Sequence, residues 1–187
     1  MILSLVKSQT KGFHDSLEGK VRNILFSTDL TPLGYQHLLS KFCHAYAELE
    51  RSISQIPEMK AILKRRSKVH LLRKDLNYVK SITGINSVNG FEPHSLAADN
   101  YAHALGMLYV MEGATLGGKF IVKHLLEVNW VTLEGCLNFF NSYGSRRGEM
   151  WKQFTKIVEN YSNQYPDQDH YIVKGARSAF VHMDKLF

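Results

Sequence analysis

One histidine near the start of the chain has neighbours at a spacing that suits metal ligation. Thr10, His14 and Glu18 follow one another at intervals of four residues, so in a helix they stack along one line. A carboxylate at this spacing can accept the proton of one ring nitrogen, which leaves the other nitrogen free to bind a metal. Lys7 and Lys11 lie on the adjoining line, where they can neutralise carboxylates of the same ligand. The alternative is a surface histidine among ordinary solvated charges.

A second unusual feature is a run of glycines inside an apolar, helical segment at residues 104–122. Gly106, Gly113, Gly117 and Gly118 each cost about 1 kcal/mol relative to alanine in a helix interior. Gly113 and Gly117 are four residues apart and clear one helix face, while the Gly117–Gly118 pair favours a kink. Two interpretations stay open: close helix packing or a simple break, and a flat ligand that lies against exposed backbone.

Other catalytic signatures are absent from the sequence. None of the nine histidines stands in an HxxxH or HExxH arrangement, and neither a GxSxG elbow nor a GxxxxGK[ST] loop occurs. Two cysteines, Cys43 and Cys136, are too few for a disulfide framework and indicate a reducing compartment. The first residues lack a basic region and a small-residue cleavage site, so we expect a cytoplasmic protein without a signal peptide.

The apolar periodicity predicts an all-α protein with a single domain over residues 1–187. Thr31 and Pro32 form an N-cap followed by proline at the first helical position. The predicted helices cover about residues 6–24, 32–53, 57–80, 93–125 (with the glycine break), 139–161 and 170–187. Loops are predicted at about 27–31, 83–93 and 163–168.

The glycine-bearing segment is apolar enough to suggest a membrane span. A transmembrane helix needs about 20 largely uncharged residues, and Glu112 and Lys119 interrupt this stretch. We therefore expect a buried helix and no membrane.

Together these stretches resemble heme oxygenase, most closely the bacterial type associated with phytochrome chromophore supply. The matching stretches keep the family's order over nearly the whole chain: Lys7–Glu18, Leu71–Leu76, Leu105–Gly118, Phe139–Gly144 with Trp151, and Ala176–Phe180. The resemblance implies a helical bundle that holds heme between a proximal N-terminal helix and a kinked, glycine-rich distal helix. It implies His14 as the iron ligand, with Glu18 bonded to its far nitrogen. It places Gly113, Gly117 and Gly118 on the distal face.

The same resemblance assigns further residues to the cofactor. Lys7 and Lys11 are candidates for the heme propionates, Thr10 for a further contact with heme, and Phe180 for the pocket wall. Three more residues either contact propionates or simply pack: Tyr109, Tyr143 and Arg147. The implied reaction converts heme to biliverdin, carbon monoxide and ferrous iron with O2. Its electrons come from a ferredoxin, a flavodoxin or an NADPH-dependent reductase.

One position departs from the family's pattern. Many heme oxygenases have an aspartate directly after the first distal glycine, where it organises the waters that deliver protons. This chain has Ala114 there, and its neighbours Thr115 and Leu116 offer no carboxylate. Glu112 precedes Gly113 and is expected to point away from the ring. Proton delivery then depends on waters held by backbone carbonyls or by Thr115, which puts the activity in question.

The positive charge of the chain is concentrated in one segment. Lys and Arg exceed Asp and Glu by six, and residues 58–80 hold eight cations against two carboxylates: Lys60, Lys64, Arg65, Arg66, Lys68, Arg73, Lys74 and Lys80 against Glu58 and Asp75. One helix would thus carry the whole surplus of positive charge. It is either a solvated face or a docking surface at Lys60–Lys80 for an acidic electron donor. Nucleic-acid binding is disfavoured, because only Tyr78 among these residues offers a ring for stacking.

Two other functions remain as alternatives. A heme-binding sensor or carrier with the same pocket would bind heme without turning it over. A thiaminase-like hydrolase of the same fold would need an active cysteine beside a carboxylate, and neither Cys43 nor Cys136 has such a neighbour in sequence.

Overall fold

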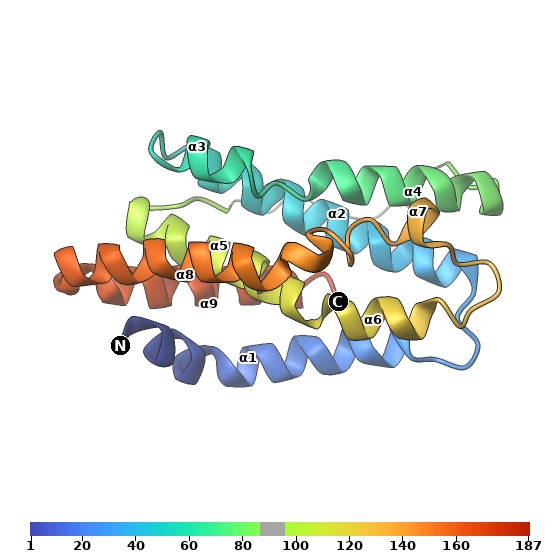
Figure 1. The fold of residues 1–187 in the computed structure, drawn as a ribbon, viewed down its shortest axis with the longest axis horizontal. Helices are drawn as coiled ribbons and strands as arrows, with labels where there is room; N and C mark the ends of the chain where they lie inside the picture. The colour runs from blue at the N-terminus through green and yellow to red at the C-terminus, as the bar shows by residue number, and fades with distance from the viewer. Residues whose placement is uncertain (87–95) are drawn as a thin grey trace.

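The computed structural model describes residues 1–86 and 96–187, which form helices and contain no strand, as predicted. Within these residues nine α-helices follow in order: α1 Ile2–Leu25, α2 Pro32–Ser54, α3 Met59–Lys64, α4 Val69–Thr83, α5 Tyr101–Ala114, α6 Gly118–Leu125, α7 Leu133–Cys136, α8 Arg147–Gln164 and α9 Asp169–Asp184. Three short 3-10 turns join them in the described part: η1 Thr115–Gly117, η2 Gly144–Arg146 and η3 Pro166–Gln168. The helices stack as a bundle, with α3 and α4 along one side and α1 along the other (Figure 1).

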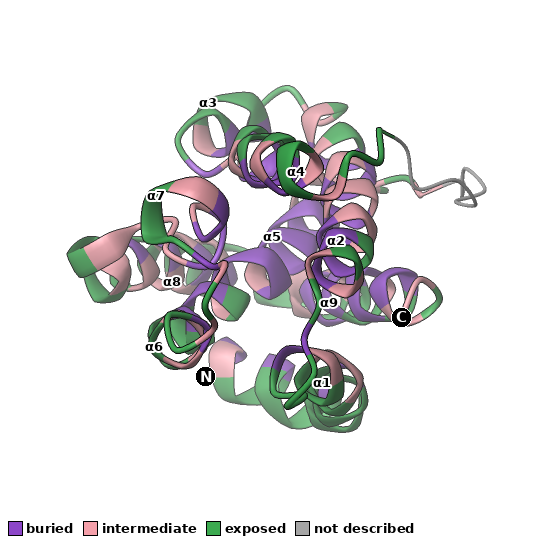
Figure 2. Cartoon of the chain, turned by 90° about the vertical axis from the view of Figure 1, so that its right-hand side faces the viewer, coloured by how far each residue is buried: buried purple, intermediate pink, exposed green. Residues whose placement is uncertain are grey.

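Helix α5 runs through the middle of this bundle (Figure 2). Ten of its fourteen residues are buried, which explains why its sequence is apolar on every side. Residues Tyr101–Leu125 are long and apolar enough by composition to cross a membrane, but half of the most apolar window is buried inside the bundle. The apolarity of this stretch is therefore that of a core helix, as expected.

Two glycines let α5 and α9 cross in direct backbone contact. A methyl group added at Gly106 would lie 1.9 Å from the carbonyl oxygen of Ile172. One added at Gly175 would lie 1.9 Å from the carbonyl oxygen of His103. For Gly106, close helix packing is thus the correct interpretation.

Several helix boundaries follow from local sequence. The hydroxyl of Thr31 accepts a hydrogen bond from the amide of Gly34 and caps α2, whose first residue is Pro32. Asn100 caps α5 in the same way through the amide of His103. Helix α5 therefore begins at Tyr101, later than predicted; Pro93 lies outside the described residues.

The predicted helix over residues 57–80 is wrong, because this segment forms two helices, α3 and α4. Its break is stabilised by a carboxylate from α2. Glu50 accepts hydrogen bonds from the amide of Lys68 at 2.6 Å, the amide of Val69 at 3.2 Å and the hydroxyl of Ser67 at 2.7 Å. Since these amides are the unpaired donors at the start of α4, Glu50 caps this helix from another element.

The predicted helix over residues 139–161 also begins later, at Arg147. Buried Asp75 of α4 accepts hydrogen bonds from the amides of Asn138 and Phe139, which holds this stretch in a turn. Gly144 then adopts a positive φ of 52°, a conformation that suits glycine. The turn ends before α8 starts.

Candidate functional site

His14 lies on an exposed flank of α1 with one ring nitrogen directed at carboxylates. Its Nδ1 is 3.6 Å from a carboxylate oxygen of Glu18 and 3.4 Å from one of Asp15, and 58% of its side chain is exposed. No residue in the described part of the chain makes a hydrogen bond to its Nε2. The hydrogen bond of Nδ1 is thus to Asp15, and Glu18, the predicted partner, lies just beyond hydrogen-bond distance, while Nε2 is available to a ligand.

The ring of His14 packs against α9. Phe180 is buried, and its ring meets the imidazole edge-on, with the two centroids 6.1 Å apart. Helix α1 is also joined to α9 by the ion pair between Lys20 and Asp184 at 2.8 Å and by a hydrogen bond from Ser16 to the same carboxylate. These contacts fix the position of the helix that carries His14.

The glycine-rich helix bends where the sequence predicted a kink. Helix α5 passes into the 3-10 turn η1, and α6 starts at Gly118. The hydroxyl of Thr115 donates to the carbonyl of Glu112 at 2.7 Å, so this residue stabilises the bend, and its proton is engaged there. A methyl group at Gly118 would lie 2.1 Å from the carbonyl oxygen of Phe140, which makes Gly118 a packing position and not an open one.

Gly113 and Gly117 have open surroundings. A methyl group at Gly117 would meet no atom within 4 Å, and one at Gly113 would touch only the ring of Trp151, at 3.8 Å. Ala114 and Gly117 are both exposed. The two interpretations of the glycines thus divide between residues: Gly106 and Gly118 serve close packing, and Gly113 and Gly117 leave backbone uncovered.

The open glycines lie on one line of residues along α5 and α6, and His14 lies on another line along α1. The two lines converge at their C-terminal ends. Phe120 and His124 continue the spacing of Gly113 and Gly117 along α6. At the end of the other line, which runs from His14 through residues 18 and 22, the ring of Phe26 stacks on that of His124 with centroids 4.3 Å apart. Figure 1 shows α6 beside the C-terminal half of α1.

This stack joins the two lines at their C-terminal ends. Phe120, on the glycine line, is 74% exposed. A flat apolar ligand between the two lines would meet an imidazole on one side and bare backbone on the other. Phe26, Phe120 and His124 were not among the predicted site residues, although their spacing from His14 and Gly113 is visible in the sequence.

The other predicted cofactor residues occupy different environments. Lys7 is exposed, and Lys11 pairs with Asp15, which raises the pKa of Lys11. Thr10 is buried and its hydroxyl donates to the carbonyl of Val6 at 2.7 Å, so its predicted contact with heme is not supported. Tyr109 packs on Trp151, with ring centroids 5.4 Å apart, and burial raises the pKa of its hydroxyl.

Tyr143 belongs to a buried ionic cluster, not to the space beside His14. Its hydroxyl donates to Glu112 at 2.7 Å and accepts a hydrogen bond from Lys68 at 2.7 Å. Lys68 and Arg66 both bind the carboxylate of Glu112, whose side chain is fully buried. Glu112 thus points away from the glycine face, as expected. A propionate contact by Tyr143 is not supported.

Arg147 lies behind the bend, where its Nη2 donates to the carbonyl of Phe140 at 3.5 Å. It therefore contacts the turn that covers Gly118. Its predicted contact with a propionate remains untested, and its observed role is to pack this turn.

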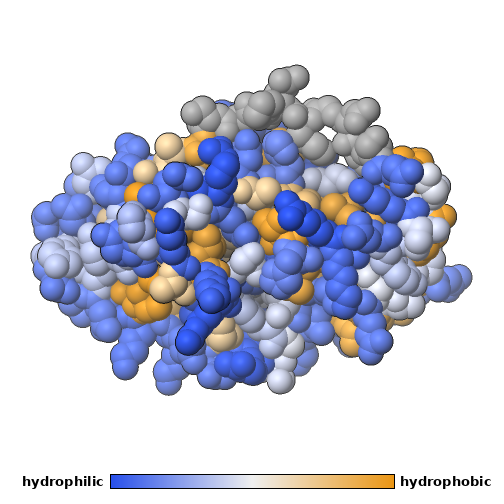
Figure 3. Space-filling model, turned by 90° about the horizontal axis from the view of Figure 1, so that it is seen from above, coloured by the Kyte–Doolittle hydropathy of each residue, from blue (hydrophilic) through white to orange (hydrophobic). Residues whose placement is uncertain are grey.

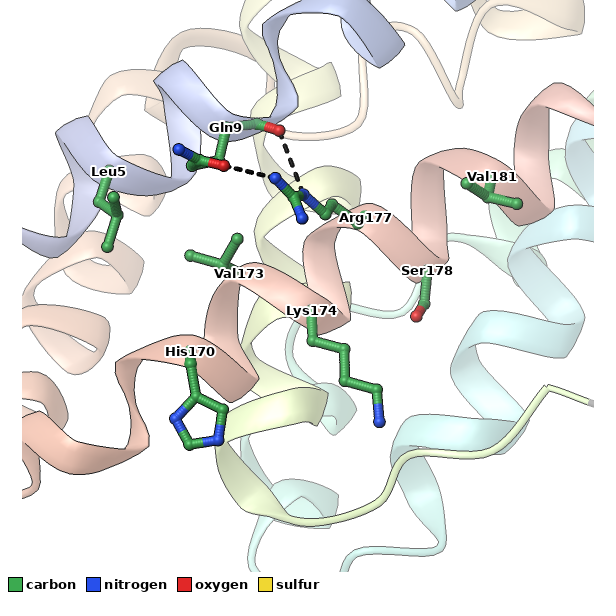
Figure 4. A pocket seen from close by; sticks show the side chains of 8 residues that line it. All are labelled: Leu5, Gln9, His170, Val173, Lys174, Arg177, Ser178 and Val181. Atoms are coloured by element: carbon green, nitrogen blue, oxygen red, sulfur yellow. Dashed lines mark hydrogen bonds between the residues drawn. The ribbon is translucent and has the colours of Figure 1, made fainter.

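A shallow groove of about 480 Å³ between α1 and α9 lies away from this space (Figure 4). Gln9 lines it and accepts two hydrogen bonds from Arg177. Gln9 and His14 are five residues apart, which places them about 140° apart around the helix axis. The groove therefore belongs to the other flank of α1.

Comparisons with known proteins identify the family and the fold. The family model described as heme oxygenase matches residues 2–187. Among curated protein sequences, none matches this chain. The fold is similar to a crystal structure of the NO- and CO-bound heme oxygenase from Neisseria meningitidis, with a TM-score of 0.77 and 21% identity, over 100% of this chain and 89% of that chain. The all-α heme oxygenase fold is thus confirmed, and the chain belongs to the heme oxygenase family.

Proposed function

We propose that this chain cleaves heme to biliverdin, carbon monoxide and ferrous iron, with His14 as the iron ligand. The observation that carries the proposal is the placement of an accessible imidazole and an uncovered glycine face on two lines that meet at the Phe26–His124 stack. When bound, heme supplies the iron that activates O2 and is itself the ring that is opened. Membership of the phytochrome-associated type is part of the proposal and rests on the sequence resemblance alone.

The residues around His14 fit an iron ligand. A proton on Nδ1 faces the carboxylates of Glu18 and Asp15, which keeps the lone pair of Nε2 directed outward. Phe180 limits rotation of the imidazole through its edge contact. Neutral imidazole on one side leaves the opposite side of the iron for O2.

The opposite wall fits a flat ring. Gly113 and Gly117 carry no side chain that would hold a ring away from the backbone, and Phe120 would be covered by it. An aromatic side chain buries about 150–250 Å² when fully covered, so this contact favours binding. Ala114 adds little bulk to the same exposed surface.

The propionates are proposed to bind near Lys7 and Lys11. Lys7 is exposed and makes no ion pair with a described residue; Lys11 would exchange Asp15 for a propionate. Tyr109 lies one helical turn before Gly113, and its hydroxyl makes no hydrogen bond within the described part of the chain. We propose it as a further polar contact.

Proton delivery is proposed to use waters held by backbone carbonyls near the bend. Thr115 already donates its proton to the carbonyl of Glu112, and Glu112 is turned into the buried cluster. Residues 113–118 contain no carboxylate. A rate below that of enzymes with a distal aspartate follows from this.

The electron donor is proposed to be an acidic ferredoxin or flavodoxin, or an NADPH-dependent reductase. The structure separates the basic segment from His14, since α3 and α4 lie on the opposite side of the bundle from α1 (Figure 1). Arg66 and Lys68 are moreover buried and bound to Glu112. Exposed cations beside the proposed heme site suit the donor better: Lys119 and Lys123.

The test is turnover by the hemin-loaded protein. We expect loss of the heme absorption and release of biliverdin when ascorbate or a ferredoxin–reductase system supplies electrons under air. Carbon monoxide should form in equal amount. Stable heme absorption with no biliverdin would instead establish the alternative, a heme-binding sensor or carrier of the same fold.

A further inference from the structure

We propose that a cleft on the far side of the bundle from His14 binds a small phosphate-bearing anion with an apolar body. The cleft has a volume of about 890 Å³ and lies between the α3–α4 break and the start of α8. Figure 3 looks onto this side, where hydrophilic side chains surround apolar recesses. The proposal is independent of the heme site.

The side chains around this cleft carry positive charge only. The lining includes no Asp or Glu and has five basic residues: Arg65, Arg66, Lys68, His70 and Arg146. Arginine guanidinium groups bind phosphate in a bidentate manner, which suits this composition. A concave surface lined by one sign of charge also concentrates ligands of the opposite sign.

The carboxylates next to this cleft act mainly on its buried cations. Glu112 pairs with both Arg66 and Lys68, and Glu50 also acts on Lys68. Burial lowers the pKa of Lys68, and an anion in the cleft would favour its protonated form. Glu50 caps α4 through backbone amides and Ser67.

Among the described residues, one carboxylate pairs with the exposed rim. Arg146 and Glu149 lie 3.2 Å apart in solvent, a pair that contributes little, and Arg146 Nη2 also donates to Met150 Sδ at 3.9 Å. Arg65 and His70 are exposed and form no ion pair with a described residue. These side chains can therefore turn toward an anion at small cost.

The size and the remaining walls define the class of ligand. Organic ligands generally occupy pockets of about 300–1,000 Å³, which is far more than inorganic phosphate fills. Ile62, Leu71 and Ile157 form an apolar part of the wall, and Ser142 and Gln153 add neutral polar groups. An organophosphate about as large as a mononucleotide matches both the charged and the apolar sides.

The experiment is calorimetric titration of the full chain with pyrophosphate and with AMP at constant ionic strength. We expect one site per chain for both probes, with AMP bound no more weakly than pyrophosphate because its body meets the apolar wall. Arg65→Gln with Arg146→Gln should weaken binding by about tenfold or more, because two phosphate contacts are removed. Both residues are exposed, so the fold should be preserved, and circular dichroism checks this.

The matched control removes two charges from the same side outside the cleft. Lys60→Gln with Lys64→Gln should change the affinity by less than about twofold, since exposed charges act weakly at a distance in salt. An equal loss of affinity in both double variants would mean that the effect comes from the overall charge of the chain, and it would overturn the proposal. Absence of binding by the wild-type chain would also overturn it.

Discussion

Gly117 and Gly118 are neighbours at the bend of the distal helix, yet only Gly118 lies against another backbone segment. A methyl group at Gly118 would come within 2.1 Å of the carbonyl oxygen of Phe140, whereas at Gly117 it would meet nothing within 4 Å. One glycine therefore permits packing, and the other keeps a surface bare.

This difference predicts that the same substitution has different effects on stability at the two positions. Gly118→Ala should lower the free energy of unfolding by about 1–3 kcal/mol, because the turn at Phe140 must shift. Gly117→Ala should stay within about 1 kcal/mol of wild type, because no neighbour is crowded. It should nevertheless weaken hemin binding, since the methyl group stands on the proposed heme face. Urea unfolding and hemin titration measure the two effects; equal destabilisation by both substitutions would contradict the assignment.

Ala114 provides a test of proton delivery. Ala114→Asp places a carboxylate on the exposed surface beside Gly113, and it should raise the rate of biliverdin formation about tenfold or more if proton supply limits turnover. Ala114→Asn has nearly the same shape and cannot transfer a proton, so it should keep the wild-type rate. The heme spectrum should be the same in all three proteins. A rate unchanged by the aspartate would show that proton supply is not limiting.

The Lys20–Asp184 pair predicts a pH dependence of the α1–α9 contact. Lys20 holds the pKa of the Asp184 carboxyl below its ordinary 3.8, so the native state binds this proton less readily than the unfolded chain. The stabilisation is therefore present above pH 3.8 and is lost as the pH falls through the lowered pKa. Asp184→Asn should cost at most about 1 kcal/mol at neutral pH, because the pair is partly exposed and screened.

Chemical unfolding of wild type and Asp184→Asn between pH 3 and 7 measures this contribution. The difference between the two proteins should shrink toward the acid end of the series. A constant difference over the whole range would mean that Asp184 stabilises the contact through packing and not through its charge.

The side of the molecule that receives electrons can be located by charge reversal. Lys119→Glu with Lys123→Glu should lower ferredoxin-dependent turnover, because an acidic donor is repelled beside the proposed heme site. Turnover with ascorbate should not change. Lys60→Glu with Lys64→Glu serves as the control on the α3–α4 side. A loss of ferredoxin-dependent turnover confined to this second variant would move the docking surface back to the basic segment.

Much of the fold was predictable because its signals are local. The N-cap at Thr31, the proline at position 32 and the glycine pair at 117–118 each act on their own segment of backbone. The line from Lys7 to Glu18 was predictable for the same reason, since helix periodicity alone places these side chains on one flank.

The break between α3 and α4 was not predictable, because the group that stabilises it comes from elsewhere in the chain. Lys68 has no capping side chain of its own, and Glu50 of α2 supplies the acceptor. The late start of α8 depends likewise on Asp75, whose carboxylate holds the turn at Phe139.

The environment of Tyr143 was not predictable for a related reason. Its hydroxyl bonds to Glu112 and Lys68, which are brought to it only by the assembled bundle. The basic segment was misread as one exposed surface because two of its cations, Arg66 and Lys68, are drawn inside by Glu112.

The most direct test of the account is the absorption spectrum of the chain titrated with hemin, for wild type and His14→Ala. Wild type should bind one hemin and show the spectrum of histidine-ligated heme. His14→Ala should lose that spectrum and the turnover, and added imidazole should restore both in part. Binding of hemin by His14→Ala with an unchanged spectrum and unchanged turnover would contradict the assignment of His14 as the iron ligand.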